Sequence, residues 1–467
     1  MDFNTLKNKT VLIIGAGKTG LATAQFLVNK AKKILLTESK EESKDIEEQV
    51  QSLSKLGIEF EFNRNSDEFI NKSDLVVISP GISPKTELVK KLFSLKIPVI
   101  SDIELGSYFC TKPIIAITGT NGKTTTTTLI SHILNNSGKK TIPCGNIGNP
   151  FINIVDKMDK EIDYYVLEIS SFQIFYSPTL SCDIALCLNI TPDHLDWHID
   201  LNDYIETKYK LLKLQKNNSW SVLNWSDNTI KNFKVPNNVF HFSSNPLDKN
   251  ILDSHENFAF LEDDFLKVKR KDSIENIIHR NELKLLGSHN IENTLASIAT
   301  AKILNIETNK INAAIKTFQG VEHRLEFVRN ISGKEIYNDS KATNPESTIK
   351  AIEALSNNKH NNGTRKNITL ILGGRDKKTD LTEMIKLIKQ NINEVILFGE
   401  ARERFEQELS KNSYKNLKIV QNLNEAIDYS LQSKTDIVLF SPACASFDMF
   451  KNYEERGRIF KDLVCRL

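Results

Sequence analysis

The segment Thr118–Thr125 (TGTNGKTT) carries the strongest chemical signal in the chain. It lies between an apolar run of strand length, Ile114–Thr118, and a helical pattern. Backbone N–H groups of a glycine-containing turn can wrap a phosphate chain. Lys123 can neutralise the β- and γ-phosphates, and the Thr124 hydroxyl can bind Mg²⁺. Ile117 stands where the common Walker motif begins with glycine, so we predict a shortened GxxGKT loop that binds ATP.

A second glycine-rich segment, Gly15–Gly20 (GAGKTG), also follows a buried strand and opens a helix. GxGxxG is typical of dinucleotide-binding folds, and Glu38 stands near the end of the next predicted strand as a candidate ribose ligand. The alternative is that these glycines only permit tight packing of the helix on the strand. An NAD-dependent oxidoreductase is therefore a rival function, although hydride transfer does not need the second phosphate loop. A uridine diphosphate group on the first loop would account for both.

Two further polar clusters follow the next strands. Glu168 ends an apolar strand, where a carboxylate can hold a metal at the phosphate site or can be an ordinary loop residue. His194 and His198 are four residues apart in NITPDHLDWH. A zinc site is disfavoured, because there is no HExxH pattern or third ligand and Pro192 predicts a loop. We expect His194 to bind or adjoin Mg²⁺, and His198 to lie on the surface.

Two helices carry more ambiguous candidates. Lys208 lies on a helix predicted over Asp203–Leu214, and by itself a helical lysine indicates a solvated side chain. The segment Gly287–Asn293 (GSHNIEN) opens another helix. Asn290 and Asn293 fall one turn apart there, where their amides could read a base edge or where Asn290 could cap the helix.

The last third of the chain holds two clusters. His323-Arg324 precedes a strand and Asn338–Asn344 (NDSKATN) follows it, placing a carboxylate, an amine and hydroxyls in one turn. Ser441–Asp448 (SPACASFD) follows an apolar strand and leads into a helix, so its small residues expose N–H groups to an anion. Cys444 has no visible His or Asn partner pattern, and we expect it to be packed rather than nucleophilic.

The elements that must position these residues form three series of alternating strands and helices, which predicts parallel, doubly wound sheets. A chain of 467 residues is too long for a single core. We predict three α/β domains: a Rossmann-like domain at 1–110, a central P-loop ATPase-type domain at 111–320, and a Rossmann-like C-terminal domain at 321–467. Residues 215–285 are expected to be outer strands and loops of the central domain, and 356–363 a surface loop.

Composition narrows the class of protein. The 61 basic and 59 acidic residues give a net charge of +2, which predicts neither nucleic acid nor membrane as a partner. No signal peptide precedes the first strand, and no apolar run approaches the ~18 residues of a membrane span. The six cysteines are scattered without a CxxC pair, which is typical of reduced thiols in the cytoplasm.

Taken together in this order, eight motifs resemble the Mur ligase family: GTNGKTT, LEISSFQ, NITPDHLD, GSHNIEN, EHR, NDSKATN, GGRDKKTD and SPACASFD. The resemblance implies that the first domain binds UDP, the second ATP and the third an amino acid. SPACASFD with ISSFQ is similar to the members that add D-glutamate. It implies an ATP- and Mg²⁺-dependent ligase that joins D-glutamate to UDP-N-acetylmuramoyl-L-alanine through an acyl phosphate, in peptidoglycan synthesis, as a cytoplasmic monomer.

The resemblance also implies roles for individual residues. The catalytic residues would be Lys123, Glu168, His194 (a candidate base) and Lys208. The metal would be held by Thr124, Glu168, His194 and Lys208, the last as a carbamylated lysine with Lys210 as a rival. The ATP-binding set would be Gly119, Thr120, Asn121, Gly122, Lys123, Thr124, Thr125, Asn290, Asn293, Arg324 and Asp339. The substrate-binding set would be Gly15, Gly17, Thr19, Gly20, Ser79, Pro80, Gly81 and Asn146 for the nucleotide substrate, and Lys341, Thr343, Lys377, Ser446, Phe447 and Tyr453 for D-glutamate.

Three rival functions remain at this point. Another ligase of the same fold could add L-alanine, a diamino acid or a dipeptide, or add glutamate to folate. A nucleotide-binding oxidoreductase could be built on GAGKTG. A non-catalytic regulator is disfavoured by the presence of Lys123, Glu168 and Lys341 together.

Overall fold

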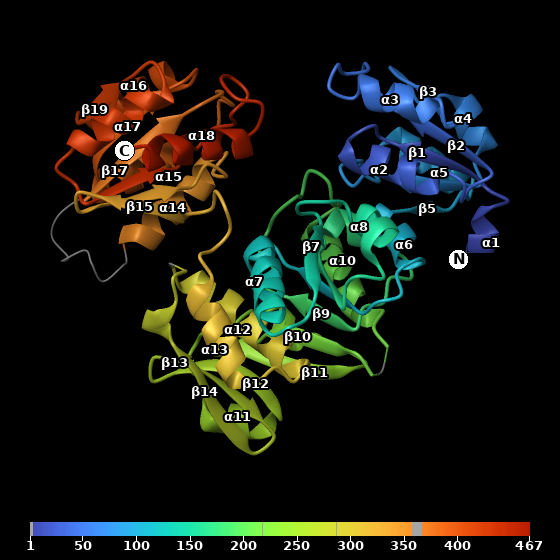
Figure 1. Ribbon diagram of the computed structural model, residues 1–467, viewed down its shortest axis with the longest axis horizontal. Helices are drawn as coiled ribbons and strands as arrows, with labels where there is room; N and C mark the ends of the chain where they lie inside the picture. Colours follow the sequence, from blue (N-terminus) through green and yellow to red (C-terminus); the bar gives the residue numbers. More distant parts are fainter. Residues whose placement is uncertain (1–2, 217, 286, 357–366) are drawn as a thin grey trace. The chain divides into compact units, whose positions relative to one another are not determined.

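The computed structural model describes residues 3–216, 218–285, 287–356 and 367–467, which contain three β-sheets. The chain forms two compact units, one of Met1–Arg280 with Ile291–Lys316, the other of Asn281–Asn290 with Thr317–Leu467. The first unit holds two sheets and the second holds one (Figure 1). The predicted three-part α/β architecture is confirmed, and the boundaries at 110 and 320 stay predictions. The surface loop predicted at 356–363 lies, apart from its first residue, outside the described residues.

The first sheet has five parallel strands in the order β3-β2-β1-β4-β5. In β1, Val11 and Ile13 pack with α2, whereas Leu12 and Ile14 pack with α4 and α5. Because helices cover both faces, the strand is apolar throughout. The strands are β1 (Thr10–Ile14), β2 (Lys33–Thr37), β3 (Glu59–Glu61), β4 (Leu75–Ile78) and β5 (Val99–Ile100). The helices are α1 (Phe3–Leu6), α2 (Lys18–Leu27), α3 (Glu47–Ser54), α4 (Asp67–Lys72), α5 (Glu87–Ser94) and α6 (Asp102–Ser107).

The second sheet has nine strands in the order β14-β13-β12-β11-β10-β9-β6-β8-β7. Strands β6 to β12 all pair in parallel, whereas β13 pairs antiparallel with both β12 and β14. Residues 215–285 therefore form outer strands of this sheet, as predicted. Strand β6 lies between β8 and β9, which brings the carboxyl ends of these three strands together. The strands are β6 (Ile114–Thr118), β7 (Thr141–Gly145), β8 (Tyr164–Glu168), β9 (Ile184–Cys187), β10 (Trp220–Asn224), β11 (Asn238–Ser243), β12 (Asn257–Glu262), β13 (Phe265–Arg270) and β14 (Ser273–His279).

The helices that accompany this sheet range from one turn to about four turns in length. They are α7 (Lys123–Asn136), α8 (Phe151–Met158), α9 (Ser171–Phe175), α10 (Leu201–Lys213), α11 (Lys249–Ser254), α12 (Ser288–Ile303) and α13 (Thr308–Thr317), with 3₁₀ turns at Ile230–Asn232 and Arg280–Glu282. Among the described residues, no helix has the length and apolar character needed to cross a membrane.

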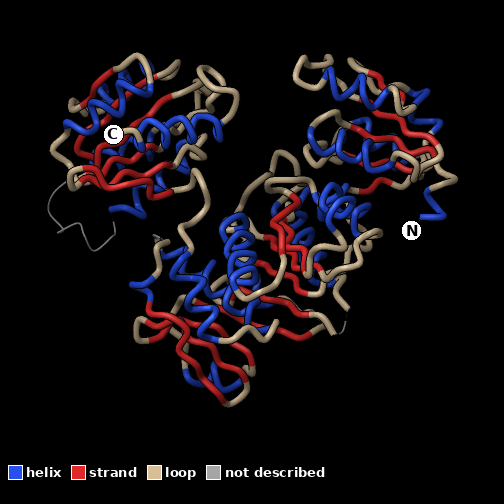
Figure 2. The backbone as a smooth tube through the Cα atoms, viewed as in Figure 1, coloured by secondary structure: helices blue, strands red, loops and turns tan. Residues whose placement is uncertain are grey.

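The third sheet has six strands in the order β15-β16-β20-β17-β18-β19, antiparallel only between β15 and β16. Helices α14, α15 and α16 pack on one face and α17 and α18 on the other (Figure 2). The strands are β15 (Glu326–Ile331), β16 (Lys334–Asn338), β17 (Ile368–Gly373), β18 (Ile392–Phe398), β19 (Leu417–Ile419) and β20 (Ile437–Phe440). The helices are α14 (Pro345–Ser356), α15 (Thr382–Asn391), α16 (Arg402–Lys411), α17 (Leu423–Gln432) and α18 (Tyr453–Cys465).

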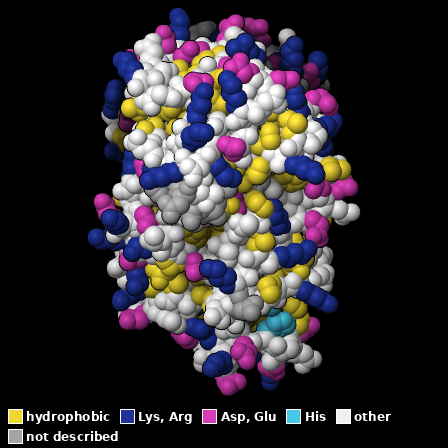
Figure 3. Space-filling view, turned by 90° about the vertical axis from the view of Figure 1, so that its right-hand side faces the viewer, with side chains coloured by type: hydrophobic (Ala, Val, Ile, Leu, Met, Phe, Trp, Pro, Cys, Tyr) yellow, Lys and Arg dark blue, Asp and Glu magenta, His cyan; other side chains and the backbone are white. Residues whose placement is uncertain are grey.

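The surface charge agrees with the nearly balanced composition. On the face drawn in Figure 3, basic and acidic side chains are interspersed rather than gathered by sign.

Candidate active site

The predicted phosphate loop is a tight turn between β6 and α7. Gly119 and Gly122 adopt φ angles of 145° and 84°, which favour glycine. A Cβ atom on Gly122 would lie 2.2 Å from Oδ1 of Asn293, so a side chain there would also collide with α12. The two glycines are therefore required by the turn itself, and the shortened motif is a complete strand–turn–helix loop.

Asn189, in the loop after β9, and Tyr204 of α10 hold this turn in place. The N–H of Thr120 donates to the carbonyl of Asn189 at 2.8 Å, and the N–H of Asn121 donates to Oδ1 of Asn189 at 2.8 Å. The hydroxyls of Thr120 and Tyr204 lie 3.0 Å apart. The turn is thus tied to the loop after β9 and to α10.

Two lysine amines converge on the same turn. Nζ of Lys123 donates to the carbonyls of Gly119 at 2.9 Å and Thr120 at 2.8 Å. Nζ of Lys208 donates to the carbonyl of Gly119 at 3.1 Å and lies 4.5 Å from the ring centre of Tyr204. Burial, helped by the positive charge of Lys123, lowers the pKa of Lys208 to about 7. A large share of this amine is therefore neutral near pH 7, and a neutral amine is a nucleophile.

The solvated position that the sequence alone suggested for Lys208 is wrong. Its side chain is buried, with 1% of the residue exposed, on the face of α10 that also carries Tyr204 and Leu211. The rival Lys210 donates to the carbonyls of Ile174 and Phe175 instead, at 3.2 and 3.0 Å. Helical periodicity was the signal that could have separated the two lysines.

Glu168 presents a buried carboxylate beside the turn. It ends β8, where it pairs with Ile117 of β6, and 3% of the residue is exposed. Oε1 accepts a hydrogen bond from Nδ2 of Asn146 at 2.9 Å. Oε2 is buried and has no hydrogen-bond partner among the described residues. A bare carboxylate oxygen at this edge fits a cation, and Asn146, predicted to contact substrate, here orients Glu168.

The possible metal ligands near the phosphate loop suit Mg²⁺, which takes few protein ligands, better than a metal ion that is coordinated only by protein side chains. Among the described residues, no three His, Cys, Asp or Glu side chains gather as a metal site. Mg²⁺ usually takes one or two carboxylates together with water and phosphate oxygens. Glu168 and the Thr124 hydroxyl match that need, and a carbamylated Lys208 would add a second carboxylate-like group.

His194 lies in the loop after β9 and is about half exposed. Its ring centre is 4.7 Å from that of Phe172, and Nε2 is 3.5 Å from Oδ2 of Asp193. Burial lowers the pKa of His194 although Asp193 opposes the shift. The ring is therefore mainly neutral at pH 7 and can accept a proton or bind a cation.

The surface position expected for His198 is wrong. Its side chain is 0% exposed. Nε2 of His198 lies 2.9 Å from Oγ of Ser171, and Nδ1 lies 2.9 Å from Oδ2 of Asp203. The apolar neighbour Trp197 is buried as well. Two adjacent residues point inward because the loop turns back on itself after His194, whose carbonyl accepts from both N–H groups.

The first sheet brings its predicted substrate residues together. A Cβ atom on Gly15, which has φ of 105°, would lie 2.3 Å from Oγ of Ser79, at the start of the Ser79-Pro80-Gly81 loop. A Cβ on Gly20 would lie 1.8 Å from the carbonyl oxygen of Gly15, so this glycine serves helix–strand packing. Gly17 and Thr19 belong to the same turn and helix. Oε2 of Glu38 accepts from the N–H of Ala16 at 2.9 Å, so this carboxylate braces the glycine turn.

The two asparagines at the start of α12 differ. Asn293 is buried, and its Oδ1 accepts from the hydroxyl of Thr126 at 3.3 Å, next to the phosphate turn and the segment that includes Thr125. The N–H of Asn290 donates to the carbonyl of Gly287 at 3.1 Å. Asn290 belongs to the second compact unit, which is described by itself below.

Within the second unit, Asp339 ties together three loops. Oδ2 accepts from Oγ of Ser441 at 2.7 Å and Oδ1 from the N–H of Leu325 at 3.1 Å. Burial raises the pKa of Asp339 to about 6, while these bonds and the charge of exposed Arg324 oppose the rise. The carboxylate is thus engaged within the protein.

The amino-acid candidates follow β16, β17 and β20 in the third sheet. Nζ of Lys377 donates to the carbonyl of Thr343 at 3.4 Å, and Nζ of Lys341 lies 5.8 Å from the ring centre of Tyr453. In the segment after β20, Ser446 is buried and Phe447 is exposed. The neighbouring Cys444 is buried, and burial raises its pKa to about 12, so this thiol is packed as predicted.

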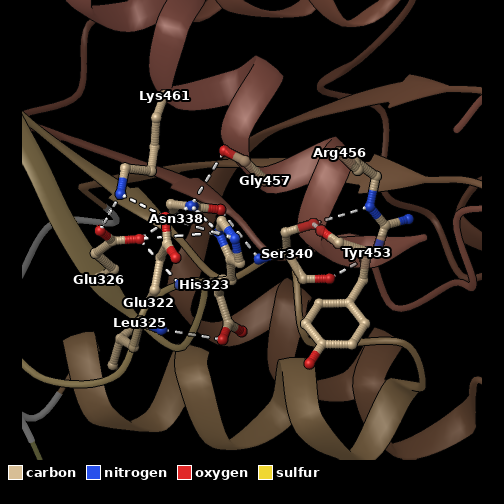
Figure 4. Close-up of polar contacts among 11 residues, drawn as sticks. Glu322, His323, Leu325, Glu326, Asn338, Ser340, Tyr453, Arg456, Gly457 and Lys461 are labelled. Carbon is tan, nitrogen blue, oxygen red and sulfur yellow. Dashed lines mark hydrogen bonds and ion pairs between the residues drawn. The ribbon is translucent and has the colours of Figure 1, made fainter. Parts of the chain in front are cut away.

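Arg456 is the residue that the sequence analysis missed. It is fully buried on α18 and donates from Nε to Oγ of Ser340 at 3.0 Å and from Nη2 to the carbonyl of Ser340 at 2.7 Å (Figure 4). Its Nη1 donates to the carbonyl of Cys444 at 3.0 Å. Burial lowers its pKa to about 10. The guanidinium therefore joins the NDSKATN and SPACASFD turns. The signal was its spacing from Phe460 and Val464 on one helical face.

We predict that Arg456→Lys lowers the free energy of unfolding by about 2 kcal/mol, because an ammonium cannot reproduce three bonds in a planar fork. It should also raise the KM for the amino acid, because both turns lose their common anchor. Denaturant unfolding and steady-state kinetics measure the two effects. Arg458→Lys, an exposed change on the same helix, is the control, and equal behaviour of the two variants would contradict this role.

Comparison with known proteins now adds to this geometry. Three family models match in order: "Mur ligase MurD-like, N-terminal domain" over residues 9–101, "Mur ligase middle domain" over 117–301, and "Mur ligase, glutamate ligase domain" over 323–444. The chain belongs to the Mur ligase family. The segments matched within this Mur ligase include the phosphate loop and the turns joined by Arg456.

Full-length relatives of this Mur ligase share more than a third of its residues. The UDP-N-acetylmuramoylalanine–D-glutamate ligase of Caldicellulosiruptor saccharolyticus is 38% identical over 472 residues, covering 99% of this chain and all of the relative. The protein of the same name from Thermoanaerobacter pseudethanolicus is 39% identical over 469 residues, covering 99% of each chain.

Solved structures agree on the fold. This Mur ligase aligns with the UDP-N-acetylmuramoylalanyl-D-glutamyl-2,6-diaminopimelate–D-alanyl-D-alanyl ligase from Acinetobacter baumannii with a TM-score of 0.59. The two share 16% identity, and the alignment covers 97% of this chain and 92% of the other. At this identity the likeness establishes the fold alone.

Proposed function

We propose that this Mur ligase joins D-glutamate to UDP-N-acetylmuramoyl-L-alanine with hydrolysis of ATP to ADP and phosphate, as a step of peptidoglycan synthesis. The observation that carries the proposal is the convergence of Lys123 and the buried amine of Lys208 on the phosphate turn beside the unpaired oxygen of Glu168. The names of its full-length relatives support the choice of D-glutamate.

The chemistry begins with activation of a poor acyl donor. The L-alanyl carboxylate attacks the γ-phosphorus of ATP, ADP leaves, and an acyl phosphate forms. Lys123 would neutralise the phosphate charge that moves during this transfer, which needs electrostatic stabilisation more than covalent catalysis. The N–H groups of Gly122, Lys123 and Thr124, where the turn enters α7, would orient the phosphates, because those of Thr120 and Asn121 already donate to Asn189.

The amine of D-glutamate then attacks the acyl carbon. A tetrahedral intermediate forms, the C–N bond is completed, the C–O bond to phosphate breaks, and the amine loses a proton. We propose neutral His194 as a candidate acceptor for that proton. Excluding water protects the acyl phosphate until the amine attacks.

Mg²⁺ is proposed as the metal cofactor, and Glu168, Thr124 and a carbamylated Lys208 are its proposed protein ligands, with His194 close by. Bound Mg²⁺ would supply positive charge to the β- and γ-phosphates. Carbamylation joins the neutral Lys208 nitrogen to the carbon of CO₂ and releases one proton, which leaves a carbamate anion. The lowered pKa of Lys208 favours this reaction at neutral pH.

Substrate recognition is proposed to use two separate sets of residues. The glycine turn at Gly15 with Ser79, and the exposed Asn146, would bind the nucleotide substrate. Lys341 and Lys377 would bind the two carboxylates of D-glutamate as point charges. We also propose that it acts in the cytoplasm as a monomer, as the resemblance to the Mur ligases implies.

Lys377→Ala tests the amino-acid set. We expect the KM for D-glutamate to rise about tenfold, corresponding to one lost charge-assisted bond of roughly 1.5 kcal/mol, with little change in the KM for ATP. Lys378→Ala, the adjacent exposed lysine, is the matched control. An equal rise in both KM values would count against a glutamate-binding role.

The central experiment measures phosphate release from ATP with UDP-N-acetylmuramoyl-L-alanine and one of D-glutamate, L-glutamate or L-alanine. Turnover that depends on D-glutamate supports the full proposal. Turnover with another acceptor keeps the ligase and changes its specificity. No turnover by folded, ATP-binding protein would overturn the proposal, and NADH consumption would revive the oxidoreductase alternative.

A further inference from the structure

The candidate metal-site groups Glu168, His194 and Lys208 lie on three segments, and one hydrogen-bond chain joins these segments; its Ser171 and His198 are buried and its Asp203 is partly exposed. Helix α9 begins at Ser171, three residues after Glu168. His198 lies in the loop that carries His194. Asp203 lies in the first turn of α10, which carries Lys208. Each of the three segments therefore contributes one residue to the hydrogen-bond chain, namely Ser171, His198 or Asp203.

The hydrogen bonds that join Ser171, His198 and Asp203 are short, and the first two of these residues have little access to water. Nε2 of His198 lies 2.9 Å from Oγ of Ser171, and Nδ1 lies 2.9 Å from Oδ2 of Asp203. His198 is 0% exposed and Ser171 2% exposed. The ring is packed against those of Trp197 at 4.7 Å and Tyr204 at 5.1 Å between centres. Such packing leaves the imidazole one orientation.

The acceptors fix the proton on the ring. A carboxylate can only accept, so the Asp203 contact requires a proton on Nδ1 of His198. The other nitrogen, Nε2, faces the hydroxyl of Ser171, which can donate to it, so the ring needs no second proton; burial lowers the pKa of His198 in the same sense. Nε2 is then an acceptor, and the hydroxyl of Ser171 donates to it.

The loop itself is held from the first sheet. Nζ of Lys85 donates to the carbonyl of His198, and Oγ of Ser83 donates to the carbonyl of Trp197 at 3.0 Å. These bonds fix the backbone of the loop but do not determine the side-chain chain of Ser171, His198 and Asp203.

We propose that Asp203, neutral His198 and Ser171 form a positioning relay that sets the relative geometry of Glu168, His194 and Lys208 around the metal. These are positioning residues, because none of them is assigned a contact with substrate or metal. Groups hydrogen-bonded directly to metal ligands typically change metal affinity or activity by about 10–100-fold when removed, and the relay acts one step further out, through the segments that carry the ligands, so we expect the lower end of that range. The inference rests on the metal site of the proposed function.

The relay makes a prediction for the unaltered protein. In protein labelled with ¹⁵N-histidine, His198 should be in the neutral Nδ1–H tautomer, with the resonance assigned by its loss in His198→Asn. A protonated ring or the Nε2–H tautomer would overturn the proposal without any altered enzyme having to be active.

Two variants test the consequence for metal. Ser171→Ala removes one hydroxyl, and Asp203→Asn can donate to Nδ1 and so reverse the tautomer. With Mn²⁺ and a non-hydrolysable ATP analogue, electron paramagnetic resonance should show Mn²⁺ binding about tenfold weaker in both. The kcat should fall by a similar factor, while the KM for D-glutamate stays within about twofold because that pocket is in the other unit.

Glu206→Gln, an exposed change on the same helix, is the matched control and should bind Mn²⁺ as the wild type does. Thermal unfolding identifies a variant that has lost its fold. In that case the tautomer of His198 in the wild type and Mn²⁺ binding by the other variant decide whether the relay exists. Wild-type Mn²⁺ affinity in folded Ser171→Ala and Asp203→Asn would overturn the relay. Absence of ligase activity in the wild type would instead overturn the proposed function, since tautomer and Mn²⁺ binding are measured independently of turnover.

Discussion

Replacing Lys208 with alanine is expected to lower kcat about a thousandfold, because loss of a carbamate ligand removes several kcal/mol of charge stabilisation from phosphoryl transfer. The neighbouring Lys210 on α10 does not replace it, because Nζ of Lys210 donates to the carbonyls of Ile174 and Phe175. Steady-state phosphate release with saturating substrates measures the loss. Lys213→Ala, an exposed change on the same helix, should leave kcat within twofold.

The chemistry of the modification gives this prediction two further readouts. Acetate or formate should restore part of the activity of Lys208→Ala, because a free carboxylate can occupy the space of the carbamate. In the wild type, the neutral fraction of Lys208 falls as pH drops through about 7, so activity should fall below that pH and recover when bicarbonate is added. Full activity of Lys208→Ala, or no response to bicarbonate with a lysine of unmodified mass, would contradict the assignment.

Lys123→Ala is expected to have the second large effect, also about a thousandfold on kcat, because we propose that this amine neutralises the charge that develops on the transferred phosphoryl group. In the structure its Nζ is held by the carbonyls of Gly119 and Thr120 and so already lies within the turn. Lys123→Arg should recover little, because the broader guanidinium does not fit that turn.

The measurement for Lys123 separates binding from transfer. Single-turnover formation of ADP should slow far more than the affinity for ATP declines. Lys139→Ala, an exposed change beyond the other end of α7, is the control. A variant that loses ATP affinity while retaining the rate of transfer would indicate that Lys123 only binds the nucleotide.

Local sequence was sufficient for the strands and the phosphate loop. The apolar runs Thr10–Ile14 and Ile114–Thr118 form parallel strands that are buried on both faces. Such strands are apolar at every position, so an uninterrupted apolar run predicts them directly. Gly119 and Gly122 adopt the positive φ angles that only glycine takes readily. The candidate site at the ends of β6 and β8 follows from the order of parallel strands.

Residues whose role depends on burial could not be read in the same way. The sequence alone indicated a solvated Lys208 and a surface His198, and both are buried. A lysine's pKa and a histidine's tautomer depend on what surrounds them, and here the surroundings come from segments such as the phosphate turn and α9. Arg456 went unnoticed because its partners, Ser340 and Cys444, lie in the turns after β16 and β20, far from it in the sequence.

The sequence by itself determined the α/β class, the phosphate loop and, through its eight motifs, the family, because these depend on local geometry and residue order. Only the tertiary structure decided which lysine of α10 reaches the phosphate turn and that His198 links Ser171 to Asp203. It also decided that Oε2 of Glu168 has no hydrogen-bond partner among the described residues. Those properties arise from groups brought together across long stretches of chain. Their chemistry is set by desolvation and by partners that no local pattern specifies.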